Sequence, residues 1–292
     1  MMYATIYYNG KEEICSVDPV GNRVFLLSEF FKSRKTMNEF IEEYKDEWTD
    51  QIAYFFGTNP DLSIPLDEVK LLAPVPNPKR NLICVGKNFV AHANELDDKI
   101  FSDNVPKYPI YFSKPDHTLI ATEEDILLHE NITKEVDYEV ELAVVIGKNG
   151  TDIPAEEAEE YIFGYSIAND ISARDLQNRH EQWYKGKSLT THCPMGPWIV
   201  HKSMLPLPLS LELKCYVNDE LRQHANAKDM VFDIPTLISD LSRGFELKAG
   251  DILLTGTPAG VGMAFDPPKY LKSGDLVKCE IEKIGVLSNR VK

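Results

Sequence analysis

Short strand-like segments recur along the chain from Asn81 onward, and this pattern limits the folds that are open to it. They are either apolar or alternate between apolar and polar residues, as strands in a sheet do. The clearest lie at residues 82–86, 108–113, 136–147, 163–172, 211–218, 251–257 and 276–285. Helices are expected between them near residues 155–162, 173–182 and 234–242. Since strands dominate and do not alternate regularly with helices, the pattern favours a β-rich α+β fold over a doubly wound parallel sheet.

The first 75 residues have another pattern and are expected to form a small N-terminal α/β module. Strand-like pieces at residues 5–8 and 23–27 precede residues 36–56, where apolar residues recur at the spacing of an amphipathic helix. The proline-rich residues 71–81 then predict a linker. We therefore expect a small module over residues 1–75 and a main domain over residues 76–292, which agrees with the total length of 292 residues.

Charge and cysteine usage exclude several kinds of protein. With 31 Lys and Arg against 46 Asp and Glu, the net charge is −15, so the surface would repel nucleic acid and anionic membranes. The five cysteines are dispersed without a CxxC pair, which favours reduced thiols over a disulfide framework or a zinc site. Neither a signal peptide nor a run of the ~20 apolar residues that span a bilayer is present. We expect a cytoplasmic protein with a small-molecule ligand; an anionic ligand would require local positive charge.

An acidic run, Asp-Tyr-Glu-Val-Glu at residues 137–141, leads into an apolar strand. Strand alternation places Glu139 and Glu141 on one face, and buried carboxylates are either paired or bound to metal. A pair like this is more often a solvated strand face, but the apolar residues 142–147 favour a site. Asp170, near the end of the expected strand at 163–172, completes an all-oxygen set, although such an Asp most often caps the next helix. The set suits Mg²⁺ or Mn²⁺, with Ca²⁺ as an alternative.

Two further pairs of polar residues have helical spacing. His92 and Glu95 are three residues apart in an expected short helix, so their side chains can touch. The carboxylate would raise the pKa of the imidazole and fix its tautomer, as in a general base, although a surface pair is the simpler interpretation. Arg174 and Gln177 share a helix face in the same way. Residues 250–262 are rich in glycine without matching a nucleotide-binding motif, and such a loop can hold a carboxylate through its backbone N–H groups.

Taken together, these segments resemble the fumarylacetoacetate hydrolase family over roughly the last three quarters of the chain. The motifs occur in the order GKN-x3-H-x2-E, DYE-x-E, GY-x3-ND-x-SARD-x-Q, GKS and TGTPAGVG. Each is weak alone, whereas five in sequence are specific. The C-terminal run TGTPAGVGMAFDPPKYLKSGD and the small N-terminal module are most similar to the bacterial oxaloacetate decarboxylase and acylpyruvate hydrolase branches. Residues 189–191, Leu-Thr-Thr, differ from the acidic or aromatic residue of many relatives, so the specificity of the pocket stays open.

The resemblance implies a mixed β-sandwich roll of the fumarylacetoacetate hydrolase type, usually dimeric, with a site for Mg²⁺ or Mn²⁺. We therefore expect a homodimer. The matching positions imply a role for each residue: Glu139, Glu141 and Asp170 as metal ligands, His92, Glu95 and Lys187 as catalytic residues, and Arg174, Gln177 and Thr257 as substrate contacts.

The implied reaction is cleavage of a carbon–carbon bond in a 2-oxoacid through a metal-stabilised pyruvate enolate, first of all decarboxylation of oxaloacetate to pyruvate and CO₂. Hydrolysis of an acylpyruvate by water that His92 and Glu95 activate, or isomerisation of a 2-hydroxydienedioate, are alternatives. A metal-binding scaffold that acts through a protein partner is an alternative of another class. The complete set of ligands, dyad and lysine argues against that as the sole role.

Overall fold

A twelve-stranded mixed sheet is the main feature of the computed structural model, which describes residues 1–95 and 105–292. The path across the sheet is β4 (Ile64–Pro65), β3 (Arg23–Leu26), β2 (Lys11–Asp18), β1 (Met2–Tyr8), β13 (Cys193–His201), β11 (Ile162–Asn169), β10 (Val140–Ile146), β16 (Ile252–Leu254), β6 (Leu82–Gly86) and β7 (Ile110–Lys114). Two short strands lie off this path, β5 (Lys70–Leu71) beside β1 and β8 (Leu119–Ile120) beside β13. Among the described strands, only the β16–β6 and β13–β8 pairs are parallel.

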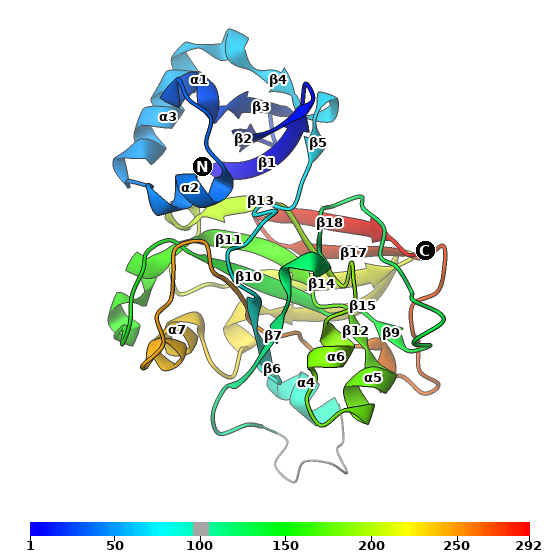
Figure 1. Cartoon of the computed structure of the whole chain (residues 1–292). Coiled ribbons are helices and arrows are strands. Elements are labelled where there is room, and N and C mark those ends of the chain that lie inside the picture. The colour runs from blue at the N-terminus through cyan, green and yellow to red at the C-terminus, as the bar shows by residue number, and fades with distance from the viewer. Residues whose placement is uncertain (96–104) are drawn as a thin grey trace.

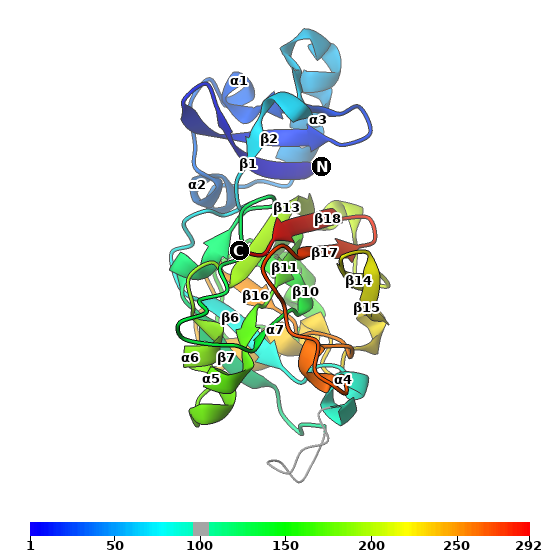
Figure 2. The same cartoon turned by 90° about the vertical axis from the view of Figure 1, so that its right-hand side faces the viewer.

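A second, antiparallel sheet faces the middle of the large one (Figure 2). Its order is β15 (Glu220–Asn226), β14 (Glu212–Val217), β17 (Leu276–Ile281) and β18 (Gly285–Arg290). Alternate residues of β14 and β17 are buried and join the residues of β10 and β11 in one apolar core. The short pair β9 (Val136–Asp137) and β12 (Ser172–Ala173) lies beside this sandwich. The predicted β-rich α+β fold is thus confirmed.

Helices are short and lie around the sheets. They are α1 (Leu27–Phe31), α2 (Met37–Glu42), α3 (Glu47–Thr58), α4 (Val90–Glu95), α5 (Arg174–Arg179), α6 (Tyr184–Lys187) and α7 (Ile234–Ser242). Short 3₁₀ segments add to them: η1 (Pro60–Leu62), η2 (Leu66–Glu68), η3 (Asp116–Thr118), η4 (Ala155–Tyr161), η5 (Lys202–Met204), η6 (Ala227–Asp229) and η7 (Gly262–Ala264). Helix α7 has the predicted bounds because the Asp233 side chain caps its start and Gly244, at φ +64°, follows its end. In the described residues, no helix has the length and apolar character needed to cross a membrane.

The single helix predicted over residues 36–56 is two helices, α2 and α3. In one straight helix, residues 40 and 48 would be about 12 Å apart along the axis. The break instead brings the Phe40 and Trp48 rings to a centroid distance of 6.0 Å, with Tyr44 against both. Aromatic packing against the sheet therefore outweighs continuation of the helix.

The N-terminal strands are part of the large sheet. Strand β1 pairs with β13, with Met2 opposite Val200 and Tyr3 opposite Ile199. The predicted linker covers residues 71–81; Leu71 ends β5, and residues 72–81 contain neither helix nor strand. Helices α4, α5 and α6 lie at the opposite end of the molecule from this N-terminal part (Figure 1). The division into residues 1–75 and 76–292 stays a prediction.

Strand β10 is buried on both faces, and this determines where its acidic residues lie. Val140, Leu142, Val144 and Ile146 face the core between the two sheets, whereas Ala143 and Val145 face a second core on the other side. Since side chains alternate, Glu141 lies on the second face, in line with Ala143. A carboxylate at this position is out of contact with bulk water.

Candidate active site

The three carboxylates predicted as ligands come together at one end of β10 and β11. Because these strands are antiparallel, the start of β10 lies beside the end of β11, and the N–H of Asp170 donates to the carbonyl of Glu139 at 2.9 Å. One oxygen from each of Glu139, Glu141 and Asp170 lies within 4.8 Å of the others, and all three residues are buried. Asp170 does not cap α5, whose N-cap is Ala173.

Buried cations surround two of these carboxylates. Lys187 Nζ lies 2.7 Å from Glu139 Oε2 and 2.7 Å from Asp170 Oδ2, so it bridges them. Lys114 Nζ lies 2.7 Å from the other Asp170 oxygen, and Arg174 Nη2 lies 2.7 Å from Glu139 Oε1. The sequence analysis named Lys187 and Arg174 but missed Lys114. Glu139 and Asp170 therefore each have two positive partners.

Glu141 has a different environment. Within residues 1–95 and 105–292 it forms no ion pair, and its Oε2 accepts the backbone N–H of Gly256 at 2.8 Å. Burial and the charges of Asp170 and Glu139 raise the pKa of Glu141 well above its usual range. Burial acts in the same direction on Glu139, but Lys187 and the neighbouring arginine outweigh it and lower the pKa of Glu139 to about 2. One carboxylate in the group therefore lacks a compensating positive charge.

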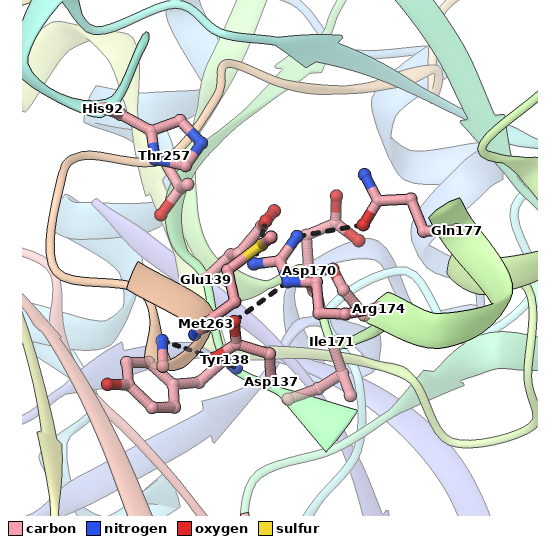
Figure 3. Close-up of polar contacts among 12 residues, drawn as sticks. His92, Asp137, Tyr138, Glu139, Asp170, Ile171, Arg174, Gln177, Thr257 and Met263 are labelled. Atoms are coloured by element: carbon pink, nitrogen blue, oxygen red, sulfur yellow. Dashed lines mark hydrogen bonds and ion pairs between the residues drawn. The ribbon is translucent and has the colours of Figure 1, made fainter. Parts of the chain in front are cut away.

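The buried His92 and the partly buried Glu95 form a pair on α4. His92 Nδ1 lies 2.7 Å from Glu95 Oε1, and Glu95 Oε2 accepts the N–H of Gly260 at 2.7 Å. Figure 3 shows His92 and Thr257 together on one side of Glu139. His92 is thus buried rather than part of a surface pair.

Arg174 and Gln177 lie together on α5, on the other side of Glu139 (Figure 3). Arg174 Nη1 donates to Gln177 Oε1 at 3.0 Å, and Nε donates to Asp137 Oδ2 at 2.9 Å. The sequence analysis did not give Asp137 a role. Two of the five N–H groups of Arg174 therefore donate to protein oxygens, and Nη2 forms an ion pair with Glu139 but no hydrogen bond within the described residues.

Thr257 faces the same space but its hydroxyl is already engaged. It donates to the carbonyl of Val140 at 3.0 Å and accepts from Gln223 Nε2 at 2.8 Å. Since a hydroxyl has one hydrogen, the Thr257 side chain holds the glycine-rich segment onto β10 in this arrangement.

These residues line one cavity of about 500 Å³, a size that suits a small ligand. Asp170 is not among the lining residues, and two aromatic residues, Phe112 and Trp183, form part of the wall. Lys187 Nζ lies 5.1 Å from the centre of the Phe112 ring. The cavity brings together eight of the nine predicted residues: His92, Glu95, Glu139, Glu141, Arg174, Gln177, Lys187 and Thr257.

Comparison with known proteins places the chain in a family. The sequence model described as "Fumarylacetoacetate (FAA) hydrolase C-terminal" matches residues 81–292. The chain belongs to the fumarylacetoacetate hydrolase family. The resemblance read from the motifs is thus confirmed.

Relatives in this family carry the names of enzymes. Oxaloacetate tautomerase YisK of Bacillus subtilis is 51% identical over 226 residues, which cover 77% of this chain and 74% of that protein. Mitochondrial oxaloacetate tautomerase Fahd2a of Rattus norvegicus is 46% identical over 229 residues, 78% of this chain and 71% of that protein.

Solved structures of fumarylacetoacetate hydrolase relatives match the whole chain. The fumarylacetoacetate hydrolase of psychrophilic Exiguobacterium antarcticum has a TM-score of 0.84 and 37% identity, covering 100% of this chain and 99% of that one. Maleylpyruvate hydrolase of Sphingobium sp. SYK-6, in complex with manganese(II) and pyruvate, has a TM-score of 0.78 and 27% identity, covering 100% and 98%. The predicted fumarylacetoacetate hydrolase type of fold is therefore confirmed.

The acidic group of this fumarylacetoacetate hydrolase family member fits a divalent cation. All three donors are carboxylate oxygens, as hard cations prefer, and one of them, Glu141, lacks a positive partner among the described residues. A bound cation would supply the missing charge. Such a group of buried carboxylates can hold a metal ion, and the identity of the ion stays a prediction.

Replacing Lys114 by methionine should lower the free energy of unfolding by about 3 kcal/mol, because Asp170 would lose one of its two buried partners. Chemical denaturation of the protein without added metal measures this change. The control is Lys32→Met, which removes an exposed lysine from a 3.8 Å surface pair with Glu29 and should cost less than about 1 kcal/mol. Equal stabilities for both variants would contradict the pairing of Lys114 with Asp170.

Proposed function

We propose that this enzyme interconverts the keto and enol forms of oxaloacetate by moving a proton at C3. The observation that carries the proposal is a His92–Glu95 pair that lines the same cavity as Glu139, Glu141, Arg174 and Lys187. It combines a general base, an anion-binding cation and a place for a divalent ion. Two relatives named oxaloacetate tautomerase, at 51% and 46% identity, support oxaloacetate as the substrate.

Glu139, Glu141 and Asp170 would hold Mg²⁺ or Mn²⁺. When bound, the divalent ion supplies a Lewis acid that polarises the 2-oxo group and stabilises charge on the enolate oxygen.

His92 would act as the base. The hydrogen bond between Nδ1 and Glu95 keeps a proton on Nδ1, which leaves Nε2 free to accept another. Nε2 takes the proton from C3, and Glu95 stabilises the imidazolium that forms. Lys187 would hydrogen-bond the oxygen on which charge develops. The imidazolium then returns the proton through water to that oxygen, which gives the enol and restores the neutral base.

Arg174 would bind a carboxylate of the substrate through N–H groups of its two terminal nitrogens, of which Nη1 donates once to Gln177 and Nη2 has no hydrogen-bond partner among the described residues. Because Asp137 and Gln177 hold the guanidinium on two sides, little conformational freedom would be lost on binding. The acidic surface of the protein does not prevent this, since the local cations are close and distant charges are screened beyond about 8–10 Å.

Cleavage of a carbon–carbon bond is the second candidate. The same enolate forms when oxaloacetate loses CO₂ or when an acylpyruvate is hydrolysed, so one arrangement of charges serves each reaction. The maleylpyruvate hydrolase structure with manganese and pyruvate favours this candidate, because its chain has the same fold over its whole length.

The test follows enol absorbance and pyruvate release in parallel, with Mn²⁺, with EDTA, and in Glu139→Ala. We expect metal-dependent keto–enol exchange that is faster than pyruvate release from oxaloacetate or acetylpyruvate. The matched control, Glu29→Ala, removes an exposed carboxylate from α1 and should behave as wild type. Faster pyruvate release than exchange would favour decarboxylase or hydrolase activity. No metal-dependent change in either signal would contradict every enzymatic proposal and favour a scaffold role.

A further inference from the structure

Asp137, at the end of β9, is fully buried and accepts four N–H groups. Its Oδ1 accepts from the backbone of Tyr138 at 2.9 Å and of Gly262 at 2.7 Å. Its Oδ2 accepts from Arg174 Nε at 2.9 Å and from the backbone of Met263 at 3.0 Å. A carboxylate offers about four lone-pair sites, so all of them are used. Asp137 thus hydrogen-bonds both helix α5 and residues 262–263, which are far apart in the sequence.

The glycine-rich segment, residues 250–262, passes close to the Asp137 carboxylate. A Cβ atom on Gly262 would lie 2.6 Å from Asp137 Oδ1 and 2.5 Å from the carbonyl oxygen of Lys269. Glycine is therefore required here for close approach. The same segment donates N–H groups to Glu141 from Gly256 and to Glu95 from Gly260. In this structure its backbone thus binds carboxylates of the protein itself.

Asp137 is connected to the acidic group through one side chain. The Arg174 guanidinium contacts Asp137 by Nε and Glu139 by Nη2, at 2.9 and 2.7 Å. Without Asp137, Arg174 would keep only its contacts with Gln177 and Glu139, so the guanidinium would be held less firmly beside Glu139. Residues behind the ligands of a metal orient them and affect metal affinity.

We infer that Asp137 is a positioning residue that ties Arg174 to the glycine-rich segment and thereby sets both the cation affinity of the site and its affinity for a 2-oxoacid. The second half of this inference rests on the proposed function. The first half concerns only the geometry of Glu139 and Arg174.

The test is Asp137→Asn, which keeps the shape but has one acceptor oxygen. Its NH₂ group would face two N–H donors whichever way it turns, so one pair of hydrogen bonds is lost. We expect the Kd for Mn²⁺, measured by calorimetry, to rise roughly 10–100-fold. The KM for oxaloacetate should rise by about tenfold or more, with a smaller change in kcat. Gly262→Ala would place a methyl group against the same carboxylate. The Kd for Mn²⁺ and the KM for oxaloacetate should therefore rise in this variant as well.

The matched control is Asp175→Asn on the same helix as Arg174. Asp175 accepts the hydroxyl of Thr133 and lies outside the cavity lining, so its loss should leave the Kd and KM at wild-type values. Circular dichroism checks that each variant is folded. If Asp137→Asn does not fold, the Kd and KM of Gly262→Ala decide whether the inference holds.

Wild-type values of the Kd and KM in Asp137→Asn, or a loss of thermal stability alone, would overturn the inference. If the wild-type enzyme does not act on oxaloacetate, the proposed function fails. The Mn²⁺ affinities then still decide whether Asp137 positions the site.

Discussion

Replacing Glu141 by glutamine should reduce keto–enol exchange of oxaloacetate by roughly 10³-fold, because a Lewis acid contributes several kcal/mol to stabilising the transition state. EDTA should have the same effect on the wild-type enzyme, and excess Mn²⁺ should restore activity only in the wild type. Glu141 is the most informative ligand because it forms no ion pair with the described residues. Its substitution therefore leaves the pairing of Lys187 and Arg174 in place.

Stability without metal provides the control for Glu141→Gln. Burial and like charges raise the pKa of Glu141, so this carboxyl is unfavourable in its charged form and its neutral replacement should not lower the thermal midpoint.

The raised pKa of Glu141 also makes Mn²⁺ binding depend on pH. Since the cation requires the ionised carboxylate, binding of Mn²⁺ to wild type should release a proton and tighten as pH rises, and the Glu141→Gln variant should lose that proton release. Equal activity in the variant and the wild type would contradict the role of Glu141 as a ligand.

His92→Ala should reduce keto–enol exchange by roughly 10²–10⁴-fold, the usual contribution of a positioned general base. Hydrolysis of acetylpyruvate should fall as far, because its water needs the same base. Decarboxylation should fall less, since it requires no proton to be removed from carbon. Comparing the three rates in one variant therefore also separates the candidate reactions.

The protein provides a matched control for His92. His224 and Glu212 form another His–Glu pair, but their side chains are 49% and 40% exposed and lie outside the cavity. His224→Ala should leave all three rates unchanged. If His92→Ala and His224→Ala lowered the three rates by the same small factor, His92 would not be the base, and the base would lie elsewhere.

Local spacing in the sequence accounts for most of what could be predicted about the site. Alternation in a strand placed Glu139 and Glu141 on one face, and helical spacing brought His92 to Glu95 and Arg174 to Gln177. The structure brings each of these pairs together. Their roles in catalysis stay predictions.

Contacts that depend on the order of strands could not be predicted in the same way. Lys114 ends β7 and reaches Asp170 only because the sheet brings β6 and β7 beside β16 and β10. The Asp137–Arg174 contact likewise joins residues 37 positions apart. A lysine after an apolar strand and an Asp before two glutamates carry no local sign of such partners.

Strand β15 was missed for a related reason, because its outer position leaves several polar residues exposed and weakens the apolar alternation.

Strand β1 pairs along one edge of β13, so residues 1–71 cover that edge. Without them, β13, a nine-residue strand that is buried throughout, would lose the strand paired along Ile199 and Val200, and the His201 N–H would lose the Met1 carbonyl to which it donates. Such an edge is a template for joining another copy of the chain, and natural sheets protect against it. A shortened chain that begins at the family-matched residues 81–292 would carry this edge exposed, together with the apolar surface that Tyr3 and Phe40 cover. We therefore expect the N-terminal strands to limit aggregation of the chain.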